Sequence, residues 1–297
     1  MTEFLQQLIN GVSLGAMYAL IALGYTMVYG VLRFINFAHS DVFMIGAYAG
    51  FFLSQFVPHQ SVGGGLAVLV GSMLICAALG IIIERLAYRP LRNRSKLNVL
   101  ITAIGVSLFL ENAGQFFFKA NPRPFPPLFP SKMINLGGGV VLSSNQMAVF
   151  VVTLVLLVAL RFIVLKTRIG TAMRAVSFNP LAASLVGINN NVVISFTFGL
   201  GSALAAAGGI LYSMNFQSID PLMGILPGMK AFVAAVLGGI GNIPGAALGG
   251  LLLGIIEAFA NGSRWSTYTD AIAFALLIMI LLFKPAGLLG KLQVEKV

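Results

Sequence analysis

The stretch TRIGTAMRAVSFNPLAASLVGINNN, residues 167–191, lies between two apolar runs, Met147–Leu165 and Val192–Tyr212. Each run is long enough to cross a bilayer, because a membrane-crossing helix needs ~20 residues. Three basic residues lie in or beside the stretch, and positive charge flanking membrane spans marks the cytoplasmic side. The sequence therefore predicts a cytoplasmic loop at 167–191 within a multi-span membrane protein.

A short helix is predicted at the centre of this loop. Asn179 followed by Pro180 is typical of a helix start, because a capping side chain precedes proline at the first helical position. Gly187 is a natural helix stop. A helix of only ~7 residues, Pro180–Val186, would not be stable alone in water, so we expect another protein to dock on it.

The composition is that of a protein embedded in a bilayer. Hydrophobic residues make up 58% of the 297 positions and charged residues 9%, with a mean hydropathy of +0.96. A soluble domain carries about 25% charged residues, so the sequence indicates a multi-span membrane protein. Glu3 stands where a signal peptide would carry basic residues, and we expect the N-terminus to be mature sequence.

Basic residues gather in clusters that adjoin apolar runs. The formal net charge of +10 would suit a nucleic-acid-binding protein, but the positive-inside rule accounts for clusters in these positions. We therefore expect no nucleic-acid partner. The clusters are Arg85, Arg89, Arg92, Arg94 and Lys96; Arg161, Lys166, Arg168 and Arg174; and Lys284, Lys291 and Lys296.

The apolar runs predict an all-α, polytopic fold with eight or nine membrane crossings. The count depends on whether a glycine- and proline-rich segment, broken near Asn242–Pro244, crosses completely. Residues 1–297 are predicted to form one transmembrane domain, with an external loop at 119–146 that holds a short strand at Val140–Leu142. The other predicted spans are Leu8–Leu32, Val42–Phe56, Leu66–Ile83, Leu97–Phe118, Met147–Leu165, Val192–Met214 and Thr269–Phe283, the last of which ends inside.

Two polar or interrupted segments, Asn36–Asp41 and Gly238–Gly245, are predicted at corresponding places in two repeated halves. Paired interrupted helices mark transport sites, and non-helical backbone at membrane depth is tolerated only against protein or a water-filled path. The alternative for the first segment is a place at the inner interface, with Arg33 and Asp41 meeting headgroups or each other. The candidate path-lining residues are Asn36, Phe37, His39, Ser40, Gly239, Gly241 and Asn242.

Ala182, Ala183 and Gly187 fit the pattern Ala-Ala-x-x-x-Gly, which is similar to the cytoplasmic coupling motif of permease subunits in ATP-binding-cassette (ABC) importers. That motif usually begins with glutamate, whereas Leu181 stands here. Small side chains would let the helix enter a cleft on an ATPase, and the glycine would let the chain turn out of it. The alternative is an ordinary interfacial loop. The predicted coupling residues are Asn179, Pro180, Ala182, Ala183 and Gly187.

Ionisable groups in apolar surroundings favour a different class, an ion-coupled secondary transporter or channel. His39, Asp41 and Glu111 would carry the ion in such a protein, because ionisable groups within a membrane are functional candidates. For Glu111 and Glu257, pairing with a buried donor or contact with the interface is the more ordinary interpretation.

Enzymatic chemistry has no support in the sequence. No G-x-x-x-x-G-K-[ST] phosphate loop, HExxH motif or nucleophile–base constellation occurs, so we expect no ATP hydrolysis by this chain. The single cysteine, Cys76, and the two histidines exclude a disulfide within the chain and a histidine-rich metal site.

Several stretches together resemble one family over nearly the whole chain: the H-type permease subunit of branched-chain amino acid ABC importers. The residues that carry the resemblance are Asn10–Tyr48, Glu84–Arg92, Gly170–Asn189 and Ala231–Gly254. The sequence departs from its relatives at Ser40, where they commonly have glycine, and at Asn179, where many have an acidic residue.

The resemblance implies a heteromeric importer in the bacterial cytoplasmic (inner) membrane, with the C-terminus in the cytoplasm. A second related permease, two cytosolic ATPases that carry ATP and magnesium, and a periplasmic binding protein would complete it, with lipid around the spans. The implied substrates are leucine, isoleucine and valine. Related permeases serve other amino acids, short amides and urea, so these substrates stay open as alternatives.

Overall fold

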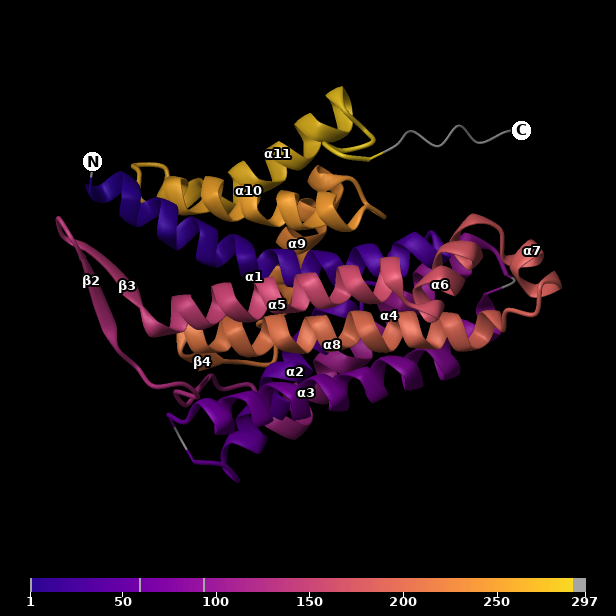
Figure 1. Cartoon of the computed structure of the whole chain (residues 1–297), viewed down its shortest axis with the longest axis horizontal. Coiled ribbons are helices and arrows are strands. Elements are labelled where there is room, and N and C mark those ends of the chain that lie inside the picture. Colours follow the sequence, from indigo (N-terminus) through magenta and orange to yellow (C-terminus); the bar gives the residue numbers. More distant parts are fainter. Residues whose placement is uncertain (1, 59, 93, 291–297) are drawn as a thin grey trace.

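The computed structural model describes residues 2–58, 60–92 and 94–290, so the predicted terminal lysines Lys291 and Lys296 lie outside the described residues. Long helices dominate, as the apolar runs predicted (Figure 1). The helices are α1 (Thr2–Leu32), α2 (His39–Ser54), α3 (Val62–Ile83), α4 (Lys96–Phe118), α5 (Ser144–Lys166), α6 (Arg168–Phe178), α7 (Pro180–Leu185), α8 (Asn190–Phe216), α9 (Ile225–Gly238), α10 (Ile243–Asn261) and α11 (Thr269–Phe283).

Short segments complete the fold. A π-helical turn at Glu84–Tyr88 and a 3₁₀ turn at Arg89–Leu91 extend α3, and a 3₁₀ turn at Ser266–Tyr268 precedes α11. Four short strands form two antiparallel pairs: β1 (Arg123–Pro124) with β4 (Ser218–Ile219), and β2 (Met133–Gly137) with β3 (Val140–Ser143). The strand predicted at 140–142 is β3.

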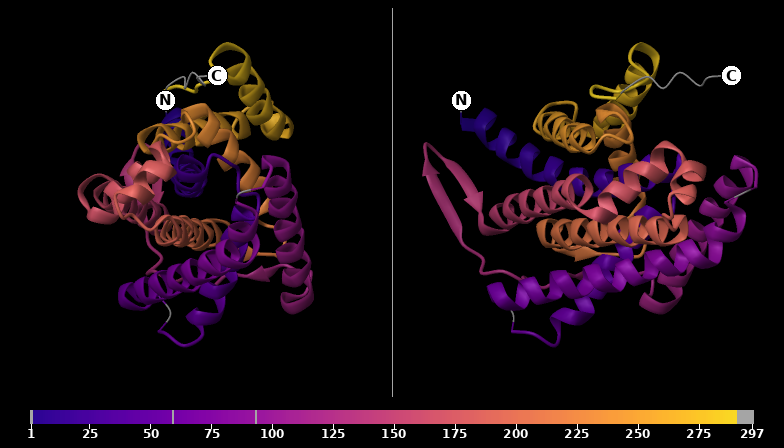
Figure 2. Two further views of the ribbon diagram at one scale, coloured as in Figure 1. Left: turned by 90° about the vertical axis from the view of Figure 1, so that its right-hand side faces the viewer. Right: turned by 45° about the vertical axis from the view of Figure 1, so that its right-hand side comes forward.

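Seven helices within the described residues are long and apolar enough to span a membrane. They are α1, α3 with its extension, α4, α5, α8, α10, and α11 with its preceding turn, while α9 is apolar but shorter. The chain is thus a multi-pass membrane protein. Its core is α1 and α8, whose small residues are mostly buried, whereas α5 and α11 expose most of their surface (Figure 2). This order suits a bilayer, because apolar side chains can face lipid and small residues let helices approach closely.

Glycine contacts reveal two repeats, α1–α4 and α8–α11, in opposite orientation. A Cβ added at Gly11 of α1 would lie 2.7 Å from Ile255 Cα of α10. The equivalent crossing in the other repeat is that of α8 with α3, where a Cβ at Gly199 would lie 3.2 Å from Ile81. Both contacts join the first helix of one repeat to the third helix of the other, a reciprocal arrangement that two repeated halves would produce.

The second helix of each repeat is a half-helix that begins inside the bundle. His39 Nε2 lies 3.2 Å from the carbonyl oxygen of Ile21 in α1, roughly 16 Å from the Leu32 end at 1.5 Å per residue, so α2 starts near mid-membrane. α9 starts at the same depth, because Gly224 packs on the backbone of Ser40. From there α2 runs toward the end that carries β2 and β3, the hairpin end, and α9 runs toward the end that carries α7, the α7 end.

The two ends of the bundle differ in construction (Figure 1). At the hairpin end, β1–β4 joins the segment after α4 to the segment after α8, and β2–β3 contacts the start of α1. Thr2 Oγ1 donates to the Gly138 carbonyl at 3.0 Å, and Gln6 Nε2 to the Val141 carbonyl at 3.1 Å. At the α7 end, α6 follows α5 directly and α7 lies farther out than α6 in the view of Figure 1.

The predicted loop at 167–191 holds two helices rather than the single short one predicted. The missed helix, α6, begins at Arg168 after Thr167, whose side chain accepts a hydrogen bond from the Gly170 N–H at 3.1 Å. Met173 and Val176 are buried while the charged side chains stay outside. Two turns of apolar contact and an N-terminal cap are enough to stabilise it against α5.

Candidate functional site

The predicted coupling helix forms as α7, and local hydrogen bonds explain its limits. Asn179 Oδ1 accepts from the backbone N–H groups of Leu181 and Ala182, each at 3.0 Å, and Pro180 follows the cap. At the other end, the Ile188 N–H donates to the Ala183 carbonyl at 3.0 Å. Gly187 has φ +85°, in the left-handed region where glycine costs least, so the chain can turn back into α8.

Large apolar side chains cover the outer surface of α7. Phe178, Leu181, Leu185 and Val186 are between 72% and 88% exposed, although they stand beyond the membrane spans. Ala183 is 3% exposed and faces the loop's own interior. The chemistry of the outer face is therefore apolar contact by these large side chains, while Ala183 packs inside the loop.

α6 connects α7 to the long helices. Ser177 Oγ donates to the carbonyl oxygen of Gly30 near the end of α1, and the Arg174 guanidinium donates to the Val164 carbonyl of α5. A Cβ at Gly241, in the turn between α9 and α10, would lie 3.9 Å from Gly30 Cα. Displacement of α7 would therefore reach α1 and the end of the half-helix α9 through direct contacts.

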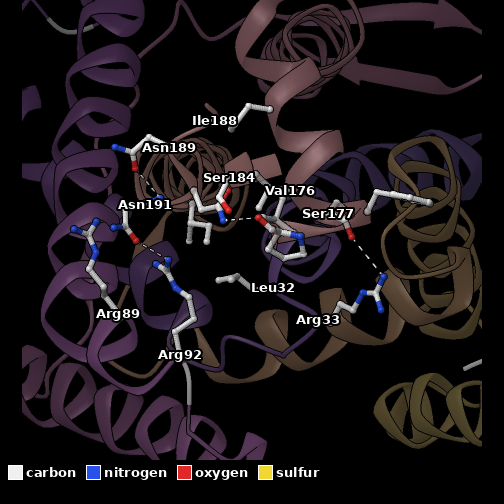
Figure 3. A pocket seen from close by; sticks show the side chains of 15 residues that line it. Leu32, Arg33, Arg89, Arg92, Val176, Ser177, Ser184, Ile188, Asn189 and Asn191 are labelled. Carbon is white, nitrogen blue, oxygen red and sulfur yellow. Dashed lines mark hydrogen bonds between the residues drawn. The ribbon is translucent and has the colours of Figure 1, made fainter. Parts of the chain in front are cut away.

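A cleft of about 900 Å³ opens beside α7 (Figure 3). The residues around it come from the end of α1, the extension of α3, the α6–α7 segment and the start of α8. They are Val31, Leu32, Arg33, Arg89, Arg92, Val176, Ser177, Phe178, Pro180, Ser184, Ile188, Asn189, Asn190, Asn191 and Ile194.

Two of the cleft's arginines are fixed by one fully buried carboxylate, Glu84 of the π-helical turn. Arg89 Nη2 lies 2.9 Å from Glu84 Oε2, and Arg92 contacts Oε1 of the same carboxylate. Ser195 Oγ of α8 donates to Glu84 Oε2 at 2.6 Å. Burial lowers the pKa of the Arg92 guanidinium below its ordinary value, and the Glu84 carboxylate opposes that shift. This network ties the extension of α3 to α8 at the α7 end.

The path candidates of the first half form a polar layer where α2 begins. Asn36 Oδ1 accepts from the Tyr88 hydroxyl at 2.5 Å, and the His39 ring packs at a tilt of 58° against Tyr25, with ring centroids 4.6 Å apart. Ser40 Oγ donates to the carbonyl oxygen of Phe37, whose side chain is 37% exposed. Asn36 and His39 of this layer are buried inside the bundle, whereas Arg33 is exposed.

The path candidates of the second half lie elsewhere. Gly239 and Gly241 form the turn at the α7 end of α9, both with positive φ, and Asn242 caps α10 by accepting from the Gly245 N–H at 3.1 Å. The prediction that this turn corresponds to Asn36–Asp41 is wrong. The segment at 219–224 takes that place instead, because Gly224 at its end packs on the backbone of Ser40.

The sequence did not predict that two buried charged side chains, Lys230 and Glu84, form ion pairs. Lys230 of α9 lies 2.6 Å from Glu257 Oε1 and 2.7 Å from Asp270 Oδ1, and the Tyr18 hydroxyl donates to Glu257 Oε2 at 2.9 Å. The expectation that Glu257 pairs with a buried donor describes this arrangement. Glu84 is the second missed group, and the signal for it was an acidic residue between an apolar run and a basic cluster.

Asp41 is buried at the start of α2, where its Oδ2 accepts from Ser107 of α4 at 2.5 Å. Within the described residues, no group of three or more histidine, cysteine, aspartate or glutamate side chains is placed to hold a metal ion.

Comparison with known proteins covers nearly the whole chain. The family model described as "Branched-chain amino acid transport system / permease component" matches residues 7–281. The high-affinity branched-chain amino acid transport system permease protein BraD of Pseudomonas aeruginosa is 45% identical over 302 residues, covering 99% of this chain and 98% of BraD. LivH of Escherichia coli K12 is 44% identical over 303 residues, with the same coverage.

A more distant relative shares part of the chain. The ribose import permease protein RbsC of Haemophilus influenzae is 30% identical over 152 residues, which is 49% of this chain and 46% of RbsC. The match of the family model, together with near-full-length identity of 44–45%, is decisive. This chain belongs to the family of permease components of branched-chain amino acid transport systems.

Proposed function

We propose that this chain is a permease subunit of an ABC importer and forms part of the path for branched-chain amino acids. The observation that carries the coupling role is the exposed apolar surface of α7, because large apolar side chains beyond the spans need a protein partner. ATP hydrolysis belongs to separate cytosolic ATPases that bind ATP and magnesium and dock on α7.

The α7 end faces the cytosol in this proposal, and the hairpin end faces the periplasm of a bacterial inner membrane. The distribution of charge supports this orientation, because basic residues near span ends favour the cytosolic side. Basic residues at the α7 end are Arg33, Arg85, Arg89, Arg92, Arg94, Arg161, Lys166, Arg168, Arg174 and Lys284. The turn after α11, which includes Lys284, lies beside the Gly239 turn at the α7 end and supports a cytosolic C-terminus.

A second, related permease is the proposed neighbour of α4. The exposed face of α4 carries Asn112 and a glycine, Gly105, whose added Cβ would have nothing within 4 Å. Glu111 is only partly buried on the same helix. Polar and charged groups at membrane depth rarely face lipid, so this face is better suited to a protein partner or a water-filled path.

The proposed mechanism follows the contacts. Docking of the loaded periplasmic binding protein at the hairpin end and ATP binding by the ATPases displace α7, and α6 transmits the displacement to α1 and the turn at Gly241. The half-helices α2 and α9 then shift where they meet near Ser40, and the path between the two permeases changes its open side.

The test is purification with the neighbouring gene products. A tag on this subunit should recover a second permease and cytosolic ATPases, and hydrolysis should rise when a binding protein and leucine are added. Leu185→Asp should lose the ATPases, whereas Met133→Asp should keep them, since both side chains are 81% exposed but Met133 lies in the hairpin. Recovery of ATPases at the wild-type level by Leu185→Asp would contradict docking on α7.

The same ATPase assay also tests the alternative substrates. If another amino acid, a short amide or urea stimulates ATP hydrolysis and leucine does not, the proposed substrate is wrong and the proposed mechanism still holds. Transport by this chain alone in liposomes, driven by pH or sodium, would favour an ion-coupled transporter that uses His39, Asp41 and Glu111.

A further inference from the structure

The cleft beside α7 has the electrostatics of an anion site. Three guanidinium groups border it, those of Arg33, Arg89 and Arg92. One carboxylate, Glu84, contacts two of them, so one negative charge faces three positive ones within the described residues. The cleft therefore carries an excess of positive charge.

The start of α8 adds to this excess. Asn189 caps the helix by accepting from the N–H groups of Asn191 and Val192, at 3.1 Å and 3.3 Å, and Asn189, Asn190 and Asn191 border the cleft. The N-terminus of a long helix bears a partial positive charge, and α8 has 27 residues. Arg89 and Arg92 point toward Asn191 at the start of α8, and Arg33 lies at the other side of the cleft, beside Leu32, with its guanidinium directed toward Ser177 (Figure 3).

The neighbouring sequence supplies no counter-charge. No aspartate or glutamate occurs from residue 112 to residue 219, which includes α6, α7 and the first part of α8. In the same loop Lys166, Arg168 and Arg174 add positive charge. An anion for this cleft has to come from outside that part of the chain.

The position of the cleft beside α7 favours a docked protein as the source of the anion. Pro180 and Ser184 of α7 form one wall, so a protein docked on α7 would cover the opening. The α6–α7 wall belongs to the loop between α5 and α8, outside the candidate spans, so under the proposed orientation the cleft opens toward the cytosol rather than toward acyl chains. We infer that the cleft receives carboxylate side chains from the docked ATPase, a conclusion that rests on the proposed function.

Arg33 is the residue on which the test depends. Arg89 and Arg92 compensate the buried Glu84, so replacing them would damage the fold. Within the described residues, the exposed side chain of Arg33 makes one long hydrogen bond, 3.4 Å, to the Ser177 carbonyl. Its φ of +56° places it in the left-handed region, which a non-glycine residue adopts at some cost, and the side chain borders the cleft.

The experiment measures the affinity of the purified ATPase for the detergent-solubilised permease pair. Arg33→Glu should weaken binding on the order of tenfold at moderate salt and flatten its salt dependence, since loss of a charge contact acts through electrostatics. Arg33→Gln should show a smaller loss, and it preserves the test if Arg33→Glu fails to fold. Arg94→Glu is the matched control, because Arg94 is exposed outside the cleft and should bind as wild type.

The outcomes separate this inference from the proposed function. Failure of the wild-type pair to bind any ATPase would overturn both. Wild-type binding with unchanged affinity and salt dependence in both Arg33 variants would overturn the cleft inference alone. If native mass spectrometry in phosphatidylglycerol shows that Arg33→Glu loses bound lipid but keeps ATPase affinity, the cleft is a lipid site and the inference is wrong.

Discussion

Ser40, in the first turn of α2, packs against Gly228, in the first turn of α9, and a Cβ added at Gly228 would overlap Ser40 Cβ. Two half-helices that run in opposite directions therefore meet at their N-termini near mid-membrane. Gly224 makes an equally close approach to the Ser40 carbonyl. The two half-helices are in direct contact at this depth, so the shift that the proposed mechanism requires of them would have to change this contact.

The first prediction concerns this contact. Gly228→Ala should reduce leucine import by at least about tenfold while the protein still inserts, because the added carbon forces the half-helices apart. Import of radiolabelled leucine, normalised to the amount in the membrane, measures the effect.

Ser40→Gly in the Gly228→Ala background should restore part of the import, since it removes the carbon that the new methyl group meets. Gly63→Ala in α3 is the control and should be neutral or slightly stabilising, since an added Cβ there comes no closer than 4.0 Å to its nearest neighbour, Ser61 Oγ. Equal import by Gly228→Ala and Gly63→Ala would show that the contact has no role in transport.

The second prediction concerns the ion pairs of Lys230. Lys230→Met should lower thermal stability strongly, because it leaves the Glu257 carboxylate, which is 7% exposed, without its cation. Removing one partner of a buried pair typically costs ~3–5 kcal/mol. The double variant Lys230→Met with Glu257→Met should regain part of the loss, and Asp270→Asn should cost least, as the Asp270 side chain is 52% exposed. Size-exclusion chromatography of samples heated in detergent measures thermal unfolding and ranks the stability of the variants.

The third prediction concerns the cap of α7. Asn179→Ala should cost about 1 kcal/mol of local stability, because two backbone N–H groups lose their acceptor. Hydrogen exchange at 181–187 should accelerate while exchange in α8 stays unchanged. Asn179→Asp retains an acceptor oxygen and should protect the helix as well as asparagine does. Identical exchange in Asn179→Ala and wild type would mean that packing alone holds α7.

The fourth prediction concerns Glu84. Glu84→Gln should destabilise the protein by about 2 kcal/mol, less than for a fully buried pair because the arginine side chains keep 20–34% exposure. The exposed Glu3 at the start of α1 offers the matched control, and Glu3→Gln should unfold as wild type does. Equal melting temperatures for the two variants would show that the ion pairs of Glu84 with Arg89 and Arg92 do not stabilise the protein.

Most of the fold was accessible from the sequence because apolar runs and helix stops are local signals. Thr269–Phe283 was predicted with the bounds that α11 has. The break before α10 was predicted near Asn242–Pro244, and α10 begins at Ile243. The start of α2 at His39 was missed by three residues, because His39 and Asp41 are polar and their burial depends on Ile21 and Ser107, distant in the chain.

The candidate site was predicted less completely. The cap, proline and glycine of α7 are adjacent in sequence, so that helix could be located, although its functional role stays a prediction. The segment at 219–224 could not be recognised as a counterpart of Asn36–Asp41, because Asp220-Pro221 has the chemistry of a surface turn and only the packing of Gly224 on Ser40 places it inside. Likewise, the cleft combines four elements that no sequence spacing joins.

The hydrogen bonds from Thr2 and Gln6 to the hairpin have a consequence for biosynthesis. They place the first residue of α1 on the same side as the 119–146 loop, so under the proposed orientation the amino terminus must itself be translocated. The first basic side chain in the sequence is Arg33, and residues 1–32 carry one negative charge, Glu3, so no basic side chain in this segment opposes its translocation. A fusion tag rich in arginine at this end would oppose insertion, and tags for purification belong at the other terminus.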